Sequence, residues 1–191
     1  MMTMDRREAI LAAARATAQA HGYGGLNFRD LAAEVGIKSA SIHYYFPSKA
    51  DLGAAVARRY WEDSEARLER LWGESQDPAA CLGQYPSLFR KALENENRMC
   101  LSGFMAAEYD DLPEQVQAEV RTFGDIQVTW LAKVLSAAEP GADAVAVKQR
   151  ARAIFAAVGG AQVIARSRAD IAMYDDIIAG YRVSGLLPRN D

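Results

Sequence analysis

The sequence predicts an all-α protein of about nine helices. Three observations support this fold class: alanine is abundant, runs of β-branched residues are absent, and apolar residues recur at intervals of three or four. That interval is the period of one face of an α-helix. Hydrophobic residues make up 50% of the 191-residue chain and charged residues 25%, which is ordinary for a globular protein with a real core.

Glycines and prolines place the helix boundaries. The glycines within 22–25 favour the end of a first helix, because glycine adopts turn conformations at no steric cost. Pro78 and Pro113 suit the first turns of helices, whereas Pro86 falls inside a predicted helix that it should kink or split. The predicted helices cover residues 5–21, 28–35, 39–45, 48–73, 78–96, 99–110, 113–138, 142–167 and 170–185.

Charge is distributed unevenly along the chain. Residues 1–50 carry six Lys/Arg against four Asp/Glu, while the chain as a whole has a formal net charge of −3. A mildly basic N-terminal part on an acidic remainder fits a nucleic-acid contact confined to one end.

The sequence also predicts a cytoplasmic location. The N-terminus lacks the apolar run of a signal peptide, and no stretch approaches the ~20 apolar residues that span a bilayer. Cys81 and Cys100 are expected to be free thiols, because the cytoplasm is reducing.

The strongest local signal lies between Asn27 and Phe46. Asn27 is a favoured helix N-cap, and the apolar residues of the next two turns share one face. Gly36 is placed to end this helix, and Ser39 to cap a second short helix whose buried side holds Ile42 and Phe46. Two short helices joined by a glycine-containing turn form a helix-turn-helix, whose second helix enters the major groove of DNA.

The outward face of the second helix carries hydroxyls, aromatic rings and a cation, groups that reach phosphates and base edges. His43, Tyr44 and Tyr45 are consecutive, and three neighbours on a helix cannot all face one core. At least one large ring must therefore be exposed. From these residues alone, a DNA-binding helix and a plain helical hairpin remain open alternatives.

The first third of the chain resembles the head of TetR/AcrR-family transcriptional regulators. The resemblance rests on Ile42 and on four motifs: GY at 22–23, FRDLA at 28–32, VGIKS at 35–39 and YYFPSKADL at 44–52. It implies a helix-turn-helix domain at 1–50 and a helical ligand-binding and dimerisation domain at 51–191. It further implies a homodimer, usually a repressor, that a small-molecule effector releases from a palindromic operator.

Position by position, the resemblance implies which residues contact double-stranded DNA. We expect Ser41 and Tyr44 nearest the bases, with Arg29, Tyr45 and Lys49 on phosphates. At the position of His43 the family commonly has tyrosine, so a phosphate contact and a neutral, partly buried imidazole stay open. The full candidate set is Arg29, Lys38, Ser39, Ser41, His43, Tyr44, Tyr45 and Lys49.

The resemblance also implies that the last two helices, 142–167 and 170–185, form a four-helix dimer interface. Their alanines, glycines and aliphatic residues suit close helix packing, but periodicity alone leaves an intramolecular hairpin open.

Aromatic and apolar residues between positions 60 and 130 are suited to an effector pocket, which is mostly apolar with a few polar groups. Plain core packing is the alternative for each of them. Cys100, beside Arg98 near a predicted helix start, is either a reactive thiol or a small buried hydrophobe. The candidate ligand-binding set is Trp61, Phe89, Cys100, Phe104, Tyr109, Gln127 and Trp130.

No catalytic motif accompanies these features. The sequence contains no H-E-x-x-H, C-x-x-C, phosphate-binding loop or G-x-S-x-G. We therefore expect neither an enzyme nor a metal or cofactor. The rival class is a helical small-molecule carrier or scaffold that does not bind DNA.

Overall fold

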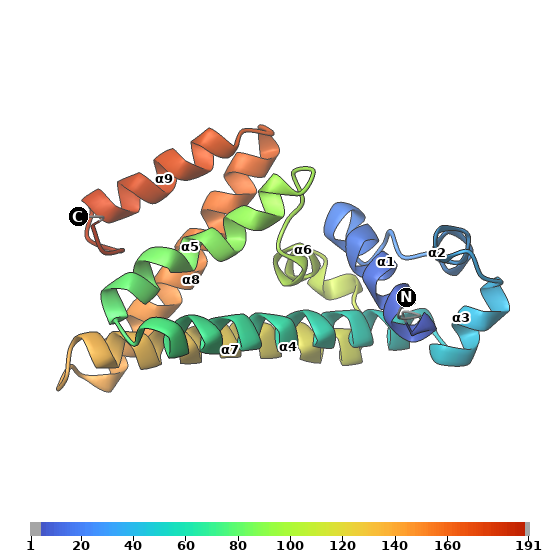
Figure 1. The fold of residues 1–191 in the computed structure, drawn as a ribbon, viewed down its shortest axis with the longest axis horizontal. Helices are drawn as coiled ribbons and strands as arrows, with labels where there is room; N and C mark the ends of the chain where they lie inside the picture. Colours follow the sequence, from blue (N-terminus) through green and yellow to red (C-terminus); the bar gives the residue numbers. More distant parts are fainter. Residues whose placement is uncertain (1–4, 190–191) are drawn as a thin grey trace. The chain divides into compact units, whose positions relative to one another are not determined.

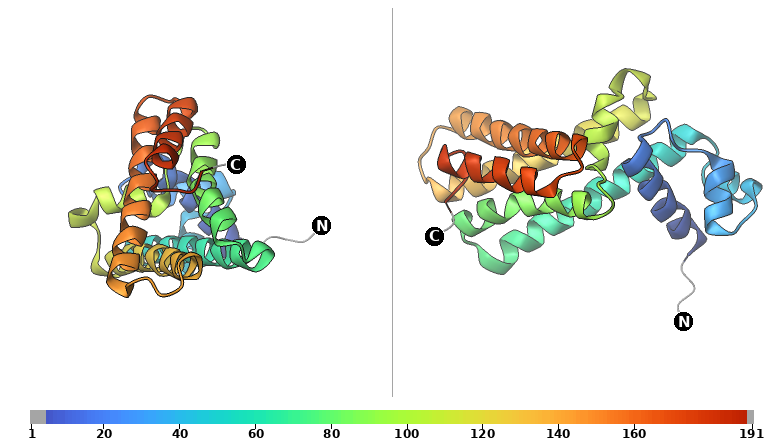
Figure 2. Two further views of the ribbon diagram at one scale, coloured as in Figure 1. Left: turned by 90° about the vertical axis from the view of Figure 1, so that its left-hand side faces the viewer. Right: turned by 90° about the horizontal axis from the view of Figure 1, so that it is seen from above.

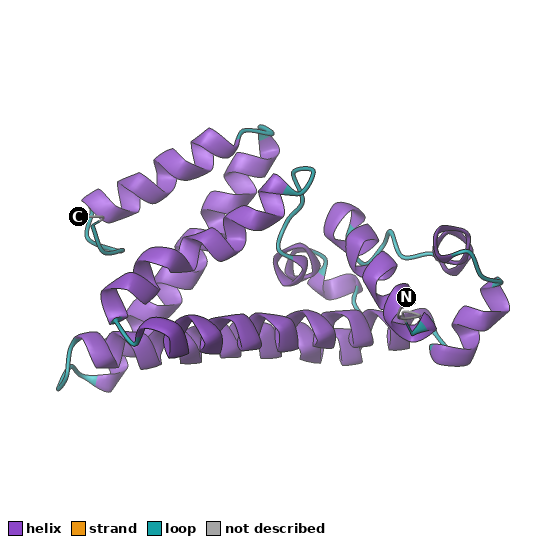
Figure 3. Ribbon diagram, in the orientation of Figure 1, coloured by secondary structure: helices purple, strands orange, loops and turns teal. Residues whose placement is uncertain are grey.

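The computed structural model describes residues 5–189, and within them every regular element is helical (Figures 1 and 3). This confirms the predicted all-α class. The sixth helix is shorter than expected, because residues 109–111 form a separate 3-10 turn, η1. The helices are α1 (Arg6–His21), α2 (Phe28–Val35), α3 (Ser39–Tyr45), α4 (Lys49–Ser75), α5 (Pro78–Glu94), α6 (Leu101–Ala107), α7 (Glu114–Ala138), α8 (Ala144–Ser167) and α9 (Ile171–Val183).

The chain forms two compact units. The first contains the residues up to Asp63 together with Leu101–Phe123, and the second contains Ser64–Cys100 and the residues from Gly124 onward. Helices α4 and α7 each begin in the first unit and end in the second. The expected division after residue 50, into a DNA-binding part and a ligand-binding part, does not coincide with these units and stays a prediction.

In the first unit, α1 packs against α2 and α6, and α2 packs against α3 (Figure 1). Its core holds aliphatic side chains from all of these elements, because each helix presents one apolar face. Among its fully buried members are Ile10, Leu31, Ile42, Leu52, Leu101 and Met105.

In the second unit, α5, α8 and α9 pack against one another (Figure 2). Its core includes Leu68, Tyr85, Leu131, Leu135, Ile154 and Tyr174.

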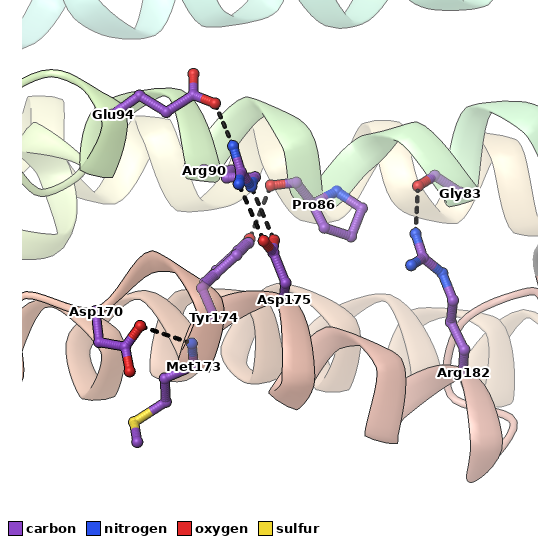
Figure 4. Close-up of polar contacts among 9 residues, drawn as sticks. All are labelled: Gly83, Pro86, Arg90, Glu94, Asp170, Met173, Tyr174, Asp175 and Arg182. Atoms are coloured by element: carbon purple, nitrogen blue, oxygen red, sulfur yellow. Dashed lines mark hydrogen bonds and ion pairs between the residues drawn. The ribbon is translucent and has the colours of Figure 1, made fainter.

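Helix α5 continues through Pro86, so of the two expected effects, a kink or a split, the split does not occur. Proline lacks the N–H that would extend the helical ladder. Side chains of α9 reach the same stretch of backbone (Figure 4). Tyr174 donates its hydroxyl to the Pro86 carbonyl at 2.7 Å, and Arg182 donates to the Gly83 carbonyl at 3.1 Å. These contacts attach α9 to α5 across the proline.

A bidentate ion pair lies beside them (Figure 4). Arg90 donates to both carboxylate oxygens of Asp175, at 2.8 and 3.0 Å, and it also pairs with Glu94. The hydrogen bonds from Arg90 lower the pKa of Asp175 below its usual 3.8. A lowered carboxyl pKa stabilises the fold above the unfolded-state pKa, and this stabilisation disappears as pH falls through the folded-state pKa.

We expect Asp175→Asn to make the free energy of unfolding less sensitive to acid. The difference should be less than about 1 kcal/mol, because both partners are partly exposed and water screens them. Urea unfolding at pH 6 and pH 3 measures it, with the exposed neighbour Asp176→Asn as control. An acid-induced loss of stability in Asp175→Asn equal to that of the unaltered chain would contradict the assignment.

Candidate nucleic-acid interface and effector site

Helix α2 begins as its sequence predicts. The side-chain oxygen of Asn27 accepts hydrogen bonds from the backbone N–H groups of Arg29 and Asp30, at 2.8 and 3.3 Å. These bonds satisfy N–H groups that have no partner inside the helix. The buried face of α2 then carries Leu31 and Ala32.

The turn between α2 and α3 depends on Gly36, which adopts a left-handed conformation with φ 74° and ψ 35°. Glycine populates that region without strain, and this allows the Ile37 N–H to return to the Ala32 carbonyl at 2.9 Å. Ser39 was expected to cap α3, but Lys38 occupies the cap position and Ser39 is the first helical residue. No side chain caps α3.

The two faces of α3 differ sharply in exposure. Ile42 and the following Phe46 are 0% and 3% exposed, whereas Tyr44 is 83% exposed. His43 lies on the Phe28 ring, with ring centroids 4.6 Å apart, and its Nδ1 is 3.4 Å from the Pro47 carbonyl. An exposed aromatic ring on a short helix with a packed opposite face is suited to a groove contact.

The other candidate DNA contacts surround Tyr44. Arg29, Lys38 and His43 are exposed, while Ser39, Ser41 and Tyr45 are half-buried. Tyr45 meets Tyr44 edge to face, with 5.2 Å between ring centroids. These residues therefore form one surface around α3, although their individual contacts to DNA stay predictions.

Lys49 has protein partners of its own. Its ammonium donates to the Gly24 carbonyl at 3.1 Å and lies 4.8 Å from the centre of the Tyr23 ring. An ammonium group has three donors, so a phosphate contact remains compatible with this position. Lys49 thus also stabilises the turn between α1 and α2.

The start of α4 is fixed by a reciprocal cap. The Ser48 N–H donates to Asp51 Oδ2 at 3.0 Å, and the Asp51 N–H donates to Ser48 Oγ at 3.1 Å. Hydrogen bonds from Ser48 and Gln115 lower the pKa of Asp51. This capping box positions the chain directly after α3.

Four of the candidate effector residues lie in the second unit: Phe89, Cys100, Gln127 and Trp130. Tyr85 donates to the Gln127 carbonyl oxygen at 2.9 Å, and the Gln127 amide donates to Ser64 at 2.9 Å. The Tyr85 ring stacks on Trp130, with centroids 5.9 Å apart. Burial raises the pKa of Tyr85 well above its usual value, so this hydroxyl stays protonated.

One donor in this cluster has no partner. The indole N–H of Trp130 makes no hydrogen bond, although the residue is only 3% exposed. A buried unpaired donor costs free energy, and such groups in native proteins call for an explanation.

Gln162 connects Cys100 to α5. Its side-chain carbonyl accepts from the Cys100 N–H at 2.9 Å, and its amide donates to the Phe89 carbonyl at 2.6 Å. Cys100 is buried, is not part of a disulfide and directly precedes α6, rather than lying in its first turn. Sequence reasoning missed Gln162, although a single amide in the otherwise apolar stretch 153–165 was a usable signal.

The other three candidate effector residues lie in the first unit. Trp61 donates its indole N–H to the buried Glu119 at 2.7 Å, and Arg58 pairs with the same carboxylate. The Tyr109 hydroxyl accepts a hydrogen bond from Arg121. Phe104 is half-buried. The predicted set is therefore divided between the two units.

Within residues 5–189, no group of three or more His, Cys, Asp or Glu side chains is arranged to hold a metal ion. Over the same residues, no helix is long and apolar enough to cross a membrane.

Comparisons with known proteins agree with the motifs of the head. The family model for bacterial regulatory proteins of the tetR family matches residues 10–56. A TetR transcriptional regulator from Legionella pneumophila is 30% identical, with a TM-score of 0.89 over 96% of this chain and 99% of that one. A TetR-family regulator from Agrobacterium tumefaciens is 29% identical, with a TM-score of 0.81 over 90% and 93%.

A more distant likeness shows the fold alone. The transcriptional regulator FadR from Bacillus subtilis, solved in complex with stearoyl-CoA, is 17% identical, with a TM-score of 0.71 over 93% of this chain and 98% of that one. No curated protein matches the chain.

A helix-turn-helix with an exposed aromatic recognition face, in an all-helical chain, defines a DNA-binding transcriptional regulator. The likeness to the Legionella protein extends over nearly the whole length of both chains. This chain belongs to the TetR family of bacterial regulators.

Proposed function

We propose that this protein is a homodimeric repressor that binds a palindromic operator through α3 and leaves it when a small molecule binds the second unit. The exposed large apolar side chains support this proposal. Among the described residues, the exposed large apolar side chains are one on α3 and four on α8 and α9: Tyr44, Val145, Val163, Ile164 and Val183. Exposed apolar surface marks interaction sites, here one for DNA and one for a second subunit.

Part of the apolar face of α9 packs inside the second unit. Tyr174 and Ile178 are buried in the second unit, so neither is free to face a partner subunit. The outward residues of α8 include Ala153, Gly160 and Ile164. Small residues allow the close approach of a second pair of helices, while the exposed aliphatic groups supply buried area.

We expect Tyr44→Ala to cost about 1–3 kcal/mol of specific DNA binding, because it removes the most exposed ring of α3. A mobility-shift assay with the DNA upstream of the protein's own gene measures this effect. Circular dichroism establishes that the variant is folded. An unchanged affinity in a folded Tyr44→Ala protein would place the DNA contact elsewhere, and no shift with the unaltered protein would favour the helical carrier.

Lys38→Ala should weaken binding to all DNA sequences alike. Each lost phosphate contact should flatten the slope of log affinity against log salt by about 1. A titration at several salt concentrations tests this, with the exposed Lys148→Ala on α8 as control. Equal salt slopes for Lys38→Ala and the unaltered protein would exclude a phosphate contact.

We further propose that the effector is an uncharged, partly aromatic molecule with a hydrogen-bond acceptor. Among the described residues, the buried polar side chains of the second unit are amides and hydroxyls, such as Ser64, Gln127 and Gln162. An ionised ligand would lose its hydration there without a counter-charge, which is costly. The unpaired Trp130 N–H is a donor suited to a ligand carbonyl.

Three naphthalene probes test the effector chemistry. Thermal shifts should show that neutral 2-acetylnaphthalene binds better than 2-naphthoate, which is charged, and better than naphthalene, which has no acceptor. Trp130→Phe should weaken binding of the ketone about tenfold and leave naphthalene unaffected, because one hydrogen bond is lost. Tighter binding of 2-naphthoate than of the ketone would contradict a neutral effector. The protein is proposed to bind its effector without transforming it and to act in the cytoplasm.

A further inference from the structure

The side-chain carboxylate of Glu108, the residue that directly follows α6, binds the turn between α1 and α2. Glu108 accepts hydrogen bonds from two consecutive backbone N–H groups of that turn, Tyr23 at 2.7 Å and Gly24 at 3.3 Å. All three residues belong to the first unit, but Glu108 lies 85 positions after Tyr23 and 84 after Gly24 in the chain. Charge-assisted hydrogen bonds of this kind are about twice as strong as neutral ones.

The turn is shaped to receive this carboxylate. Gly22 has φ 70° and ψ −172°, a conformation that side chains other than glycine rarely adopt. A Cβ at Gly22 would lie 2.4 Å from the carboxylate oxygen of Glu108, so an alanine could not coexist with the observed contact. The glycine therefore serves two purposes: it turns the backbone, and it leaves room for Glu108.

Tyr23 connects the same turn to the start of α4. Its ring lies 4.8 Å from the ammonium of Lys49 and directly against Gly53, where an added Cβ would be 2.6 Å from the ring. Lys49 also donates to the Gly24 carbonyl at 3.1 Å. Helix α4 begins a few residues after the end of α3. The turn that binds Glu108 therefore contacts the segment that directly follows α3, the helix proposed to bind DNA.

Glu108 itself is held by the backbone around it. Its N–H donates to the Met105 carbonyl at 3.0 Å, and its carbonyl accepts from the Asp111 N–H at 2.9 Å. It lies between the end of α6 and η1, and α6 packs against α1. The carboxylate is thus presented from a structured corner rather than from a free loop.

From this geometry we infer that Glu108 is a positioning residue for DNA binding. Its carboxylate fixes the α1–α2 turn, and the turn fixes the start of α4 and thereby the direction of α3. Without Glu108 the backbone N–H groups of Tyr23 and Gly24 lose their partner. The recognition helix then samples more orientations, and the two helices of a dimer match their half-sites less often.

The same contact offers a route from the effector site, a part that rests on the proposed function. The Cys100 N–H, bound to Gln162 in the second unit, immediately precedes α6, and α6 leads directly to Glu108. A ligand that displaces Cys100 would therefore also shift Glu108, because the seven residues of α6 connect the two. The positioning role holds without any effector and is tested separately.

Amide hydrogen exchange followed by NMR tests the positioning role in the full-length protein. Glu108→Ala should raise the exchange rates of the Tyr23 and Gly24 amides about tenfold, because each loses its hydrogen bond. The Phe46 amide, which is bonded to Ile42 at the end of α3, should be unchanged. Asp110→Ala, an exposed acid two residues further on, removes the same charge and serves as the matched control.

Operator affinity is the second measurement. Fluorescence anisotropy should show that Glu108→Ala binds operator about tenfold more weakly. A net loss of one hydrogen-bonded contact changes an equilibrium constant by about that factor. Asp110→Ala should bind within about twofold of the unaltered protein. Glu108→Gln keeps one acceptor and should fall between the two. If Glu108→Ala does not fold, Glu108→Gln carries the comparison.

A double-mutant cycle separates contact from backbone strain. Gly22→Ala introduces both a strained φ and a collision with Glu108, whereas in a Glu108→Ala background only the strain remains. Gly22→Ala should therefore lower operator affinity less in that background. Unchanged Tyr23 exchange and unchanged operator affinity in Glu108→Ala, or additive effects in the cycle, would overturn the inference. Loss of DNA binding by the unaltered protein would instead contradict the proposed function.

Discussion

Gly160→Glu and Ile164→Glu are each expected to convert the protein to monomers and to weaken specific operator binding by about a thousandfold or more. Both positions are exposed on α8, and Ile164 is one of the large apolar side chains on the surface. A glutamate at a helix–helix interface would be desolvated without a partner. A monomer reads only one half-site, so most of the sequence-specific free energy is lost.

Sedimentation velocity and fluorescence anisotropy measure the two consequences. Thr129→Glu, which adds the same charge to an exposed position of α7 in the same unit, is the matched control and should remain dimeric. Circular dichroism distinguishes folded monomers from unfolded chains. An intact dimer in both α8 variants would show that the interface lies on another surface.

Gln162→Leu should destabilise the protein by about 1–3 kcal/mol, because it removes both hydrogen bonds that the buried amide makes to backbone groups. Gln162 is 1% exposed and bridges the Cys100 N–H and the Phe89 carbonyl. Leucine has a similar volume, so the loss reports hydrogen bonding more than packing. Urea unfolding at a single protein concentration measures it, since dimerisation contributes to apparent stability.

The exposed Gln149→Leu on the same helix is the control and should change stability by less than about 0.5 kcal/mol. A Gln162→Leu protein as stable as this control would mean that Cys100 and Phe89 find other partners. In that case, the route from Cys100 to α6 would lose its anchor in the second unit.

The helix-turn-helix was predictable because local interactions determine it. Asn27 caps α2 from within the same turn, and Gly36 ends that helix through its own backbone conformation. Ile42 and Phe46 identify the buried face of α3 by their spacing alone. Such signals lie within a few residues of one another, so a sequence displays them directly.

The effector site and the Glu108 contact depend on long-range packing. Glu108 meets Tyr23 across 85 positions, and nothing near either residue indicates the other. Trp61 was a pocket candidate because it is a large aromatic residue, yet its indole N–H binds Glu119 in the first unit. Aromatic residues at helical spacing are common to cores and pockets alike, so periodicity could not separate the two groups.

The most direct test of the account is selection of random double-stranded DNA by the purified protein, followed by sequencing of the bound molecules. We expect one enriched motif with two-fold symmetry, whose half-site centres lie about one helical turn, 10–10.5 base pairs, or a multiple of it apart. Tyr44→Ala should lose that enrichment while remaining folded. Enrichment of no sequence, or of a single asymmetric site that Tyr44→Ala binds equally well, would contradict a homodimeric regulator that reads DNA through α3.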